Sequence, residues 1–216
     1  MPPTLSPSSL SVFKSCPRCF WLQINKGIYP PSGIFPSLPS GMDKILKSHF
    51  DSYRGKSLPP ELSSLKEEIL FPDKPLLDDW RNWRKGLKWE HNSYTLTGAV
   101  DDILKKGEKL IVLDYKTRGF PIKEDTASYY QDQLDIYTLL LKKNGYQVED
   151  YAYLIVYHPL RVERDGNVVF HRDLVKIKVS TKSAEKLFND AIKTLEGPLP
   201  PPSKDCECCG WLEKVK

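Results

Sequence analysis

Apolar residues fill positions 110–113 of the chain, and this run ends in an aspartate and a lysine on either side of a tyrosine. Alternation along a β-strand divides the segment between two faces, one with Leu110, Val112, Asp114 and Lys116 and the other with Ile111, Leu113 and Tyr115. A strand with apolar residues on both faces is typical of the buried centre of a sheet. Because a carboxylate and an ammonium are costly to bury without a partner or a metal, the pattern indicates a charged site at the edge of the core.

Other periodic segments predict the elements around this strand. Strands are predicted over 66–71, 94–104, 150–157 and 168–179, with Gly107 in the turn that leads into the 110–116 strand. Helices are predicted from Ser6 or Ser8, over about 40–51, over about 125–143 and over 183–195. This order predicts an α/β fold with a mixed central sheet flanked by helices.

The size and charge of the chain suit one folded domain. Its 216 residues carry 32 Lys and Arg against 28 Asp and Glu, and the net charge of +4 permits nucleic-acid binding without demonstrating it. No stretch is long and apolar enough to cross a membrane, and residues 1–7 lack the apolar core of a secretory signal. We therefore expect a cytoplasmic, reducing setting, in which structural disulfides are disfavoured.

Five cysteines are present, and all of them lie near the two ends of the chain. Cys16 and Cys19 form one Cys-x-x-Cys pair, and Cys206 and Cys209 form another, with Cys208 between the last two. Two such pairs can supply four thiolates to one tetrahedral zinc ion or to one iron–sulfur cluster. We predict this two-plus-two set as the metal ligands, with Cys208 as the substitute for a C-terminal member.

Three short motifs follow one another along the middle of the chain: Gly98-Ala99-Val100-Asp101, Asp114-Tyr115-Lys116-Thr117 and Gln133-Leu134-Asp135-Ile136-Tyr137. In this order and on these elements they resemble the motifs of the PD-(D/E)XK nuclease superfamily, specifically of its RecB-like exonuclease branch. The resemblance implies a restriction-endonuclease-like core and a deoxyribonuclease that depends on Mg²⁺ or Mn²⁺. The alternative for the central motif alone is a surface ion pair at the end of an ordinary strand.

The resemblance also implies roles for these residues. Asp101 and Asp114 would bind the metal together with the Tyr115 carbonyl, and such oxygen ligands suit Mg²⁺ and Mn²⁺. Lys116 would orient or activate a metal-bound water, or stabilise the phosphate.

Three further residues are expected near the predicted metal site or next to its ligands in sequence. Gln133 and Tyr137 share a helix face and are expected beside the site, in contact with nucleic acid or with Lys116. Asp102 is expected to be solvated, although a strand slip of one residue would exchange it with Asp101.

The early helix departs from the family pattern. Most members of the branch carry a histidine there as a further metal ligand, and neither Asp43 nor His49 stands at the usual distance from the glycine. Asp43, expected in the first turn, is the candidate ligand, and the helix dipole is the competing reason for a carboxylate at that place. His49 is expected to be a packed or solvent-facing side chain.

The termini complete the resemblance. RecB-like exonucleases of the CRISPR-associated and helicase-nuclease types join their termini through a 4Fe–4S cluster. The resemblance therefore implies such a cluster here, with zinc as the alternative. It would lie in a single domain of residues 1–216, with 1–38 and 197–216 as the metal clip and 39–196 as the nuclease core.

Aromatic and basic residues alternate along 80–89, as on surfaces that stack bases and hold the phosphates of a single strand. The candidates for phosphate contact are Arg84, Lys85, Lys88 and, just past the 110–116 strand, Arg118. Trp80 and Trp83 are expected to pack onto the core instead. His158 is expected in a loop after a strand.

The combined expectation is a metal-dependent DNA nuclease, and the resemblance implies an exonuclease acting on single-stranded or frayed DNA. The alternatives are a catalytically inactive nucleic-acid-binding module and a structural subunit of a helicase or CRISPR-adaptation complex.

Overall fold

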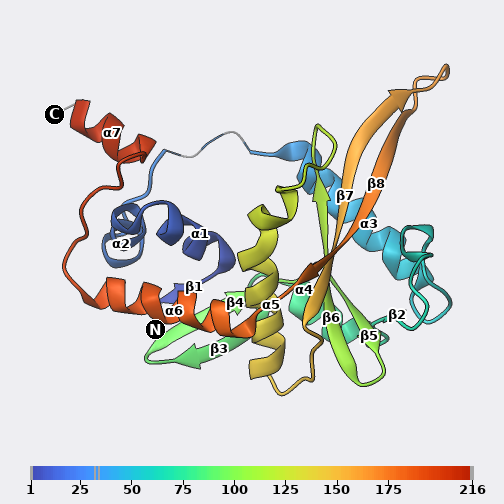
Figure 1. The fold of residues 1–216 in the computed structure, drawn as a ribbon, viewed down its shortest axis with the longest axis horizontal. Coiled ribbons are helices and arrows are strands. Elements are labelled where there is room, and N and C mark those ends of the chain that lie inside the picture. The colour runs from blue at the N-terminus through green and yellow to red at the C-terminus, as the bar shows by residue number, and fades with distance from the viewer. Residues whose placement is uncertain (1, 32, 34, 215–216) are drawn as a thin grey trace.

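The computed structural model describes residues 2–31, 33 and 35–214, and its helices cover both faces of a central sheet (Figure 1). The strands are β1 (Thr4–Leu5), β2 (Ile69–Leu70), β3 (Leu87–His91), β4 (Tyr94–Gly98), β5 (Asp102–Lys106), β6 (Lys109–Thr117), β7 (Tyr151–Val162) and β8 (Val168–Lys178). The α-helices are α1 (Pro7–Ser15), α2 (Pro17–Lys26), α3 (Ser37–Tyr53), α4 (Lys74–Arg81), α5 (Gln131–Lys143), α6 (Thr181–Glu196) and α7 (Glu207–Lys214). Two 3₁₀ segments, Pro60–Leu62 and Thr126–Tyr130, lie between them.

The central sheet has five strands in the order β2-β5-β6-β7-β8. β6 lies at its centre, antiparallel to β5 and parallel to β7. A second sheet of three strands has the order β1-β4-β3. The predicted α/β fold with a mixed sheet flanked by helices is confirmed.

The two faces of β6 belong to two separate hydrophobic clusters, as its alternating pattern predicts. Leu110 and Val112 lie in the cluster that also contains residues of α5 and α6, and Ile111 and Leu113 lie in the cluster that contains residues of α3. Figure 1 shows α3 and α5 on opposite sides of the sheet. β6 is therefore buried on both faces.

The predicted strand over 94–104 is wrong in one respect, because it is two strands in two different sheets. β4 ends at Gly98 in the smaller sheet, and β5 begins at Asp102 in the larger one. At the crossing, the Val100 N–H donates to the Trp80 carbonyl (3.3 Å) instead of to a strand. Asp101 therefore lies outside the alternation of either strand. The turn at Gly107 is confirmed, and its φ of +55° explains the glycine.

Other boundaries differ where tertiary contacts override the local pattern. β7 continues to Val162 because its pairing with β8 continues, so His158 lies in a strand, 5% exposed, and the expectation of a loop is wrong. The strand predicted over 66–71 is reduced to β2. The helix predicted from 125 starts as a 3₁₀ segment before α5, and the helix predicted over 183–195 is confirmed as α6.

Two N-terminal helices show how local signals set the element ends. Ser6 caps α1, and Ser6 and Ser9 exchange side-chain and backbone hydrogen bonds in a capping box. α3 begins at Ser37, earlier than predicted, so Asp43 lies beyond the first turn and the helix dipole does not account for it. No helix in the described ranges is long and apolar enough to cross a membrane.

The N-terminal helices α1 and α2 lie on the same side of the molecule as α7, which comes close to α2 (Figure 1). The Trp21 indole donates to the Gly197 carbonyl (3.1 Å), and the Asn25 amide donates to the Leu195 carbonyl (3.0 Å). Arg18 donates to the carbonyl of Pro200, within the proline-rich stretch that follows α6 (3.3 Å). These bonds hold that stretch along α2 and direct the last cysteines toward the first ones.

Candidate active site and cysteine centre

The C-terminal end of β6 brings carboxylates and ammoniums together. Asp114 and Lys116 project from one face of the strand and form an ion pair. The Lys47 ammonium, on α3, lies 3.0 Å from an Asp101 oxygen and 2.8 Å from an Asp43 oxygen. Asp43 and Asp101 therefore share one cation, so the structure brings the early-helix carboxylate to the predicted site.

Asp114 is fully buried (0% exposed). Gln133 Nε2 donates to its Oδ1 (3.3 Å), whereas Oδ2 contacts the Lys116 ammonium and accepts no well-directed hydrogen bond from the described residues. Burial raises the pKa of Asp114 to about 8, and the neighbouring Asp101 charge adds to this shift, while Lys116 opposes it. A divalent cation would stabilise the charged form, so the donor set fits the oxygen ligands that Mg²⁺ and Mn²⁺ prefer.

Asp101 and Lys116 are held in their charged forms. Burial works against the Asp101 carboxylate, but the Lys47 and Lys116 ammoniums outweigh it and lower its pKa. The Tyr115 N–H also donates to Asp101 Oδ2 (3.1 Å). Burial likewise opposes the Lys116 ammonium, and the two carboxylates outweigh it and raise its pKa. Lys116 therefore remains a cation around neutral pH.

A buried ion-pair network lies next to these residues and corrects the expectation for Asp102. Asp102 is 0% exposed, not solvated, because two guanidiniums compensate its charge: Arg54 at 2.8 Å and Arg81 at 3.0 Å. The Tyr115 hydroxyl also donates to Asp102 (2.6 Å). Arg81 in addition donates through Nε to the Asp101 carbonyl (2.7 Å). The network therefore fixes the backbone of Asp101 and the ring of Tyr115.

The third motif lies against the first. Gln133 Nε2 donates to the Tyr137 hydroxyl (2.9 Å) as well as to Asp114. Burial raises the pKa of Tyr137, so its hydroxyl stays protonated. A Cβ on Gly98 would lie 2.8 Å from the ring of Tyr137 and 2.8 Å from Leu140, which explains the glycine of the first motif by close packing.

Replacing this glycine should disturb the site through Tyr137. We expect Gly98→Ala to cost about 1–3 kcal/mol of unfolding free energy, as overpacked positions do, and to weaken any metal-dependent cleavage. Urea unfolding followed by circular dichroism measures the first effect. Gly41→Ala is the matched control: it meets nothing within 4 Å inside α3, and it should stabilise by about 0.5–1 kcal/mol. Equal stability of Gly98→Ala and the wild-type chain would contradict the packing explanation.

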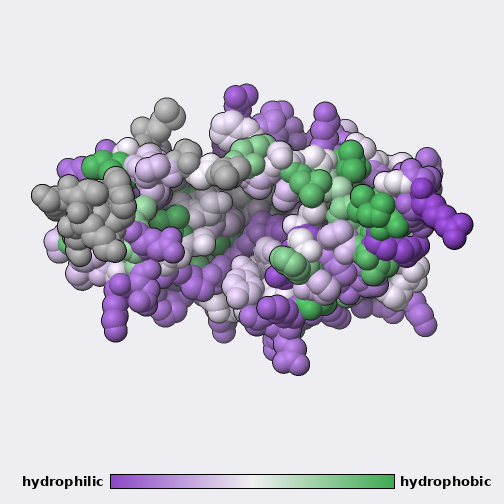
Figure 2. Space-filling model, turned by 90° about the horizontal axis from the view of Figure 1, so that it is seen from above, coloured by the Kyte–Doolittle hydropathy of each residue, from purple (hydrophilic) through white to green (hydrophobic). Residues whose placement is uncertain are grey.

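Two cavities adjoin the site. A small one of about 230 Å³ is lined by Asp43, Asp101, Tyr115 and Lys116, among others. A groove of about 1590 Å³ is lined by Gln133, Tyr137, Tyr129, Tyr130, Trp83, Arg84, Lys88 and residues of α1. Figure 2 views the molecule onto the edge at which β6 ends and shows a recess near the middle of this face.

The predicted phosphate-binding residues separate into two groups. Arg84 and Lys88 line the groove, whereas Lys85 forms an exposed ion pair with Asp79 (2.7 Å) and is not among the lining residues. The Arg118 guanidinium donates to the Thr126 hydroxyl (2.7 Å).

The two tryptophans of the basic segment also differ. Trp80 is buried as expected, packed on Phe71, but Trp83 is 74% exposed, so its expected place in the core is wrong. The reason is that α4 ends at Arg81, and Trp83 follows it in a surface turn with Arg84 stacked over its ring. On the early helix, His49 pairs with Glu61 (3.2 Å) and is not among the residues that line either cavity.

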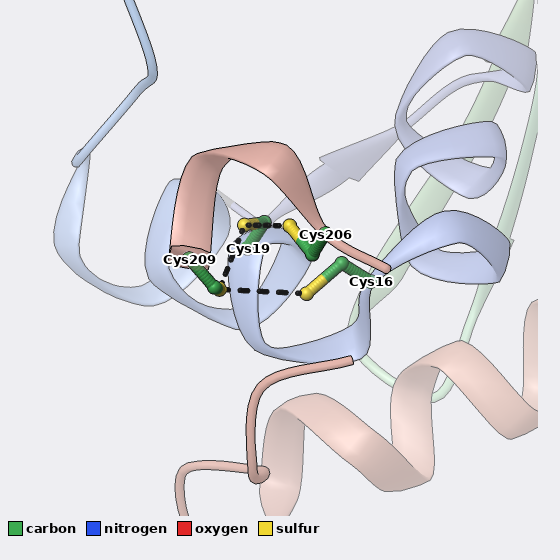
Figure 3. Close-up of side chains that lie close together, drawn as sticks. All are labelled: Cys16, Cys19, Cys206 and Cys209. Atoms are coloured by element: carbon green, nitrogen blue, oxygen red, sulfur yellow. Dashed lines mark hydrogen bonds between the residues drawn. The ribbon is translucent and has the colours of Figure 1, made fainter. Parts of the chain in front are cut away.

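The cysteine centre joins the two ends of the chain (Figure 3). Cys16 stands between α1 and α2, Cys19 lies in α2, Cys206 precedes α7 and Cys209 lies in α7. Their sulfurs all lie within 4.8 Å of one another, with 3.5 Å between Cys19 and Cys206 and 3.8 Å between Cys16 and Cys209. Cys208 is not part of this group. The structure therefore brings together the predicted two-plus-two set, which could bind a metal ion.

The sulfurs of this centre are electrostatically unequal. Burial opposes the Cys16 thiolate, but backbone hydrogen bonds from Ser203 and Cys19 outweigh it and lower its pKa to about 6. Burial raises the pKa of Cys209 to about 11. A bound cation would stabilise all four thiolates, which is the state in which cysteine binds metals.

Comparison with known proteins places this arrangement in a family. Residues 4–213 match the family model of the PD-(D/E)XK nuclease superfamily, and the chain belongs to that superfamily. Its members are generally nucleases that hydrolyse phosphodiester bonds with the help of a metal ion. No curated protein matches the chain.

Among solved structures, one described as "Crystal structure of SSO0001" is similar to the chain at 16% identity and a TM-score of 0.39, covering 91% of this chain and 79% of the other. A likeness of that degree supports no statement about activity.

Proposed function

We propose that the chain is a Mg²⁺- or Mn²⁺-dependent deoxyribonuclease of the RecB-like exonuclease type. The observation that carries the proposal is the buried pair of carboxylates Asp101 and Asp114, where burial and the Asp101 charge disfavour the charged form of Asp114 more than the contacting Lys116 ammonium favours it. A carboxylate in this state is costly unless a cation stabilises it, and the family membership gives that cation a catalytic use.

Each residue of the proposed active site has a separate role. Asp101 and Asp114, with the Tyr115 carbonyl, would hold the metal, which when bound supplies a Lewis acid for the phosphate and lowers the pKa of a water. Lys116 contacts Asp114, and from that place its ammonium would stabilise negative charge on the phosphate or orient the attacking water. Gln133 positions Asp114 and Tyr137 together through its amide.

The groove supports single-stranded DNA as substrate. It combines exposed aromatic rings, Trp83 and Tyr129, with the basic side chains of Arg84 and Lys88, and it reaches Gln133 beside the carboxylates. Aromatic rings of this kind stack on unpaired bases, whereas the cations contact the backbone.

Loss of the exposed indole should weaken this interaction. We expect Trp83→Ala to reduce affinity for a labelled oligo-dT by about 5–150-fold, since stacking contributes about 1–3 kcal/mol per base. Fluorescence anisotropy in chelator, where no cutting occurs, measures it. Tyr29→Ala serves as the control, because Tyr29 is similarly exposed (66%) but does not line the groove. Unchanged binding by Trp83→Ala would exclude the groove as the path of the strand.

For the cysteine centre, the sulfur separations favour a single ion. A tetrahedral zinc with bonds of about 2.3 Å places its sulfurs about 3.8 Å apart, close to the 3.5–3.8 Å of the contacting pairs. A 4Fe–4S cluster binds each cysteine through a different iron and needs a wider cage. We therefore propose zinc here and treat the iron–sulfur cluster implied by the resemblance as the alternative. Either ion would hold 1–38 and 197–216 together as a clip on the 39–196 core of a single domain.

A second candidate function is a nucleic-acid-binding module that does not cut. Lys47 favours it, because its ammonium already pairs with both Asp43 and Asp101, two of the candidate metal ligands. End-labelled single- and double-stranded DNA incubated with Mn²⁺, Mg²⁺ or chelator separates the two. Metal-dependent cutting supports the nuclease, and salt-sensitive binding without cutting under all these conditions supports the module.

A further inference from the structure

A second group of metal-ligating side chains lies on the β7–β8 hairpin. His158 and His171 stand directly opposite each other in the antiparallel pairing. Asp173, two residues after His171, projects from the same face of β8. One ligand atom from each of the three lies within 4.8 Å of those of the others.

The geometry points to a metal, and we propose that this triad binds a borderline divalent transition metal ion such as Zn²⁺. His158 Nε2 is 3.4 Å from Asp173 Oδ2, and His171 Nε2 is 3.4 Å from Asp173 Oδ1. Ligands around a tetrahedral ion with bonds of about 2.0–2.1 Å stand about 3.3–3.4 Å apart. Charge-assisted hydrogen bonds are shorter, at about 2.7–2.9 Å, so the separation suits a shared cation better than a direct bond.

Two features of the polar atoms agree with this. Asp173 Oδ2 is buried and accepts no hydrogen bond from the described residues. The His158 Nδ1 lies 3.4 Å from the Pro159 carbonyl, so an Nδ1–H directed there leaves the Nε2 lone pair facing Asp173. Metal-binding histidines commonly donate their second ring nitrogen to a carbonyl in this way. Two facing lone pairs repel each other, and a cation between them removes the repulsion.

The burial of the three side chains suggests an ion with an open coordination position. His158 is 5% exposed and fixed in the sheet, whereas the side chains of His171 and Asp173 remain 51% and 24% exposed. Two imidazoles and one carboxylate leave room for a water or another oxygen ligand on the solvent side. The donor set thus differs from the thiolate centre and from the oxygen-only site at Asp114.

The register places this site relative to the catalytic carboxylates. Lys116 on β6 pairs with Val156 on β7, and His158 follows two residues later on the same face. The ion would therefore add positive charge to the face of the sheet that carries Lys116, beyond the end of β6.

The test is a zinc titration of the full chain with its cysteine centre filled and Mg²⁺ in excess. We expect the wild-type chain to bind one further zinc ion, and His171→Gln and Asp173→Asn to bind it at least tenfold more weakly. His91→Gln is the control, because it removes an imidazole outside the triad. No zinc uptake beyond the cysteine centre, or uptake unchanged in His171→Gln, would overturn the proposal.

A second measurement decides if a variant does not fold. In wild-type chain labelled with ¹⁵N in its four histidines, zinc should shift the Nε2 resonances of His158 and His171 and leave those of His49 and His91 in place. Imidazolium signals at the triad that do not respond to zinc would show a plain ion pair with Asp173 and refute the metal site.

Discussion

Asp114→Asn should abolish cleavage while making the metal-free protein more stable. The amide keeps the shape of the carboxylate but cannot supply the negative charge that holds a divalent cation, so we expect activity to fall by about 10²–10³-fold or more. Burial and the Asp101 charge disfavour the charge on Asp114 more than Lys116 favours it, so replacing the carboxyl with a neutral amide should stabilise the metal-free fold. Cleavage of labelled DNA and urea unfolding of the same preparations measure the two effects.

The stability gain should depend on pH in a defined direction. The Asp114 carboxyl has a pKa of about 8 in the folded chain and an ordinary value of 3.8. Between these values the folded state retains a proton that the unfolded state has lost, so stability falls as pH rises from about 4 to about 8. In chelator, the difference in unfolding free energy between Asp114→Asn and the wild-type chain should therefore grow across that window. When Mg²⁺ is added, the difference should shrink.

The control for this prediction is Asp165→Asn, which changes an exposed carboxylate in the turn between β7 and β8. It should leave both cleavage and the pH profile unchanged. Full activity of Asp114→Asn would remove the basis for a nuclease centred on this residue, whereas lost activity without the pH-dependent gain would show that Lys116 compensates the charge of Asp114 fully in solution.

The second large effect is expected at the cysteine centre. Cys209→Ser should release the metal and detach α7 from α2, because Cys209 Sγ contacts both Cys16 and Cys19. Structural zinc sites bind with apparent free energies of about 10–16 kcal/mol, so a loss on the order of 3 kcal/mol or more is expected. That corresponds to a fall in Tm of roughly 6–12 °C for a chain of this size. Metal content and thermal unfolding measure it.

Cys208→Ser provides a matched control at the neighbouring position. Cys208 lies outside the four-cysteine group, so its variant should retain the metal and the wild-type Tm. The opposite result, metal lost in Cys208→Ser and kept in Cys209→Ser, would favour the arrangement in which Cys208 replaces a member of the set. Absorption near 400 nm (about where iron–sulfur centres absorb) in the wild-type protein would assign the cluster, and a colourless protein with bound zinc would assign the single ion.

The parts of the fold that follow from local pattern were predictable. The apolar run with a charged end identifies β6. A strand that is buried on both faces has apolar residues at consecutive positions, whichever elements pack against it. The two Cys-x-x-Cys pairs predict that the four cysteines lie together, because such pairs are typical of one metal site with four thiolate ligands. The helical spacing of Gln133 and Tyr137 predicts their shared face, and their amide–hydroxyl bond of 2.9 Å follows from it.

The rest depends on residues that are distant in sequence. The charge of buried Asp102 is compensated by Arg54, directly after α3, and by Arg81 of α4, and nothing near Asp102 in the sequence signals either partner. The split of the 94–104 segment between two sheets likewise depends on pairing with β1 and β3. Lys47 has a weak signal, because it stands four residues after Asp43 on one helix face, but its contact with Asp101 requires the folded chain.

The bonds between α2 and the stretch after α6 have a consequence for shortened versions of the chain. α1, which lines the groove with Pro7, Ser8 and Ser11, is followed directly by Cys16 and α2. A truncation after Gly197 would retain every catalytic carboxylate and remove the three C-terminal cysteines, including the two of the metal set, Cys206 and Cys209. Such a fragment would lose the support of α1, which forms one wall of the groove. Reduced cleavage by the fragment would therefore reflect poorer binding of substrate in the groove, not the loss of a catalytic residue.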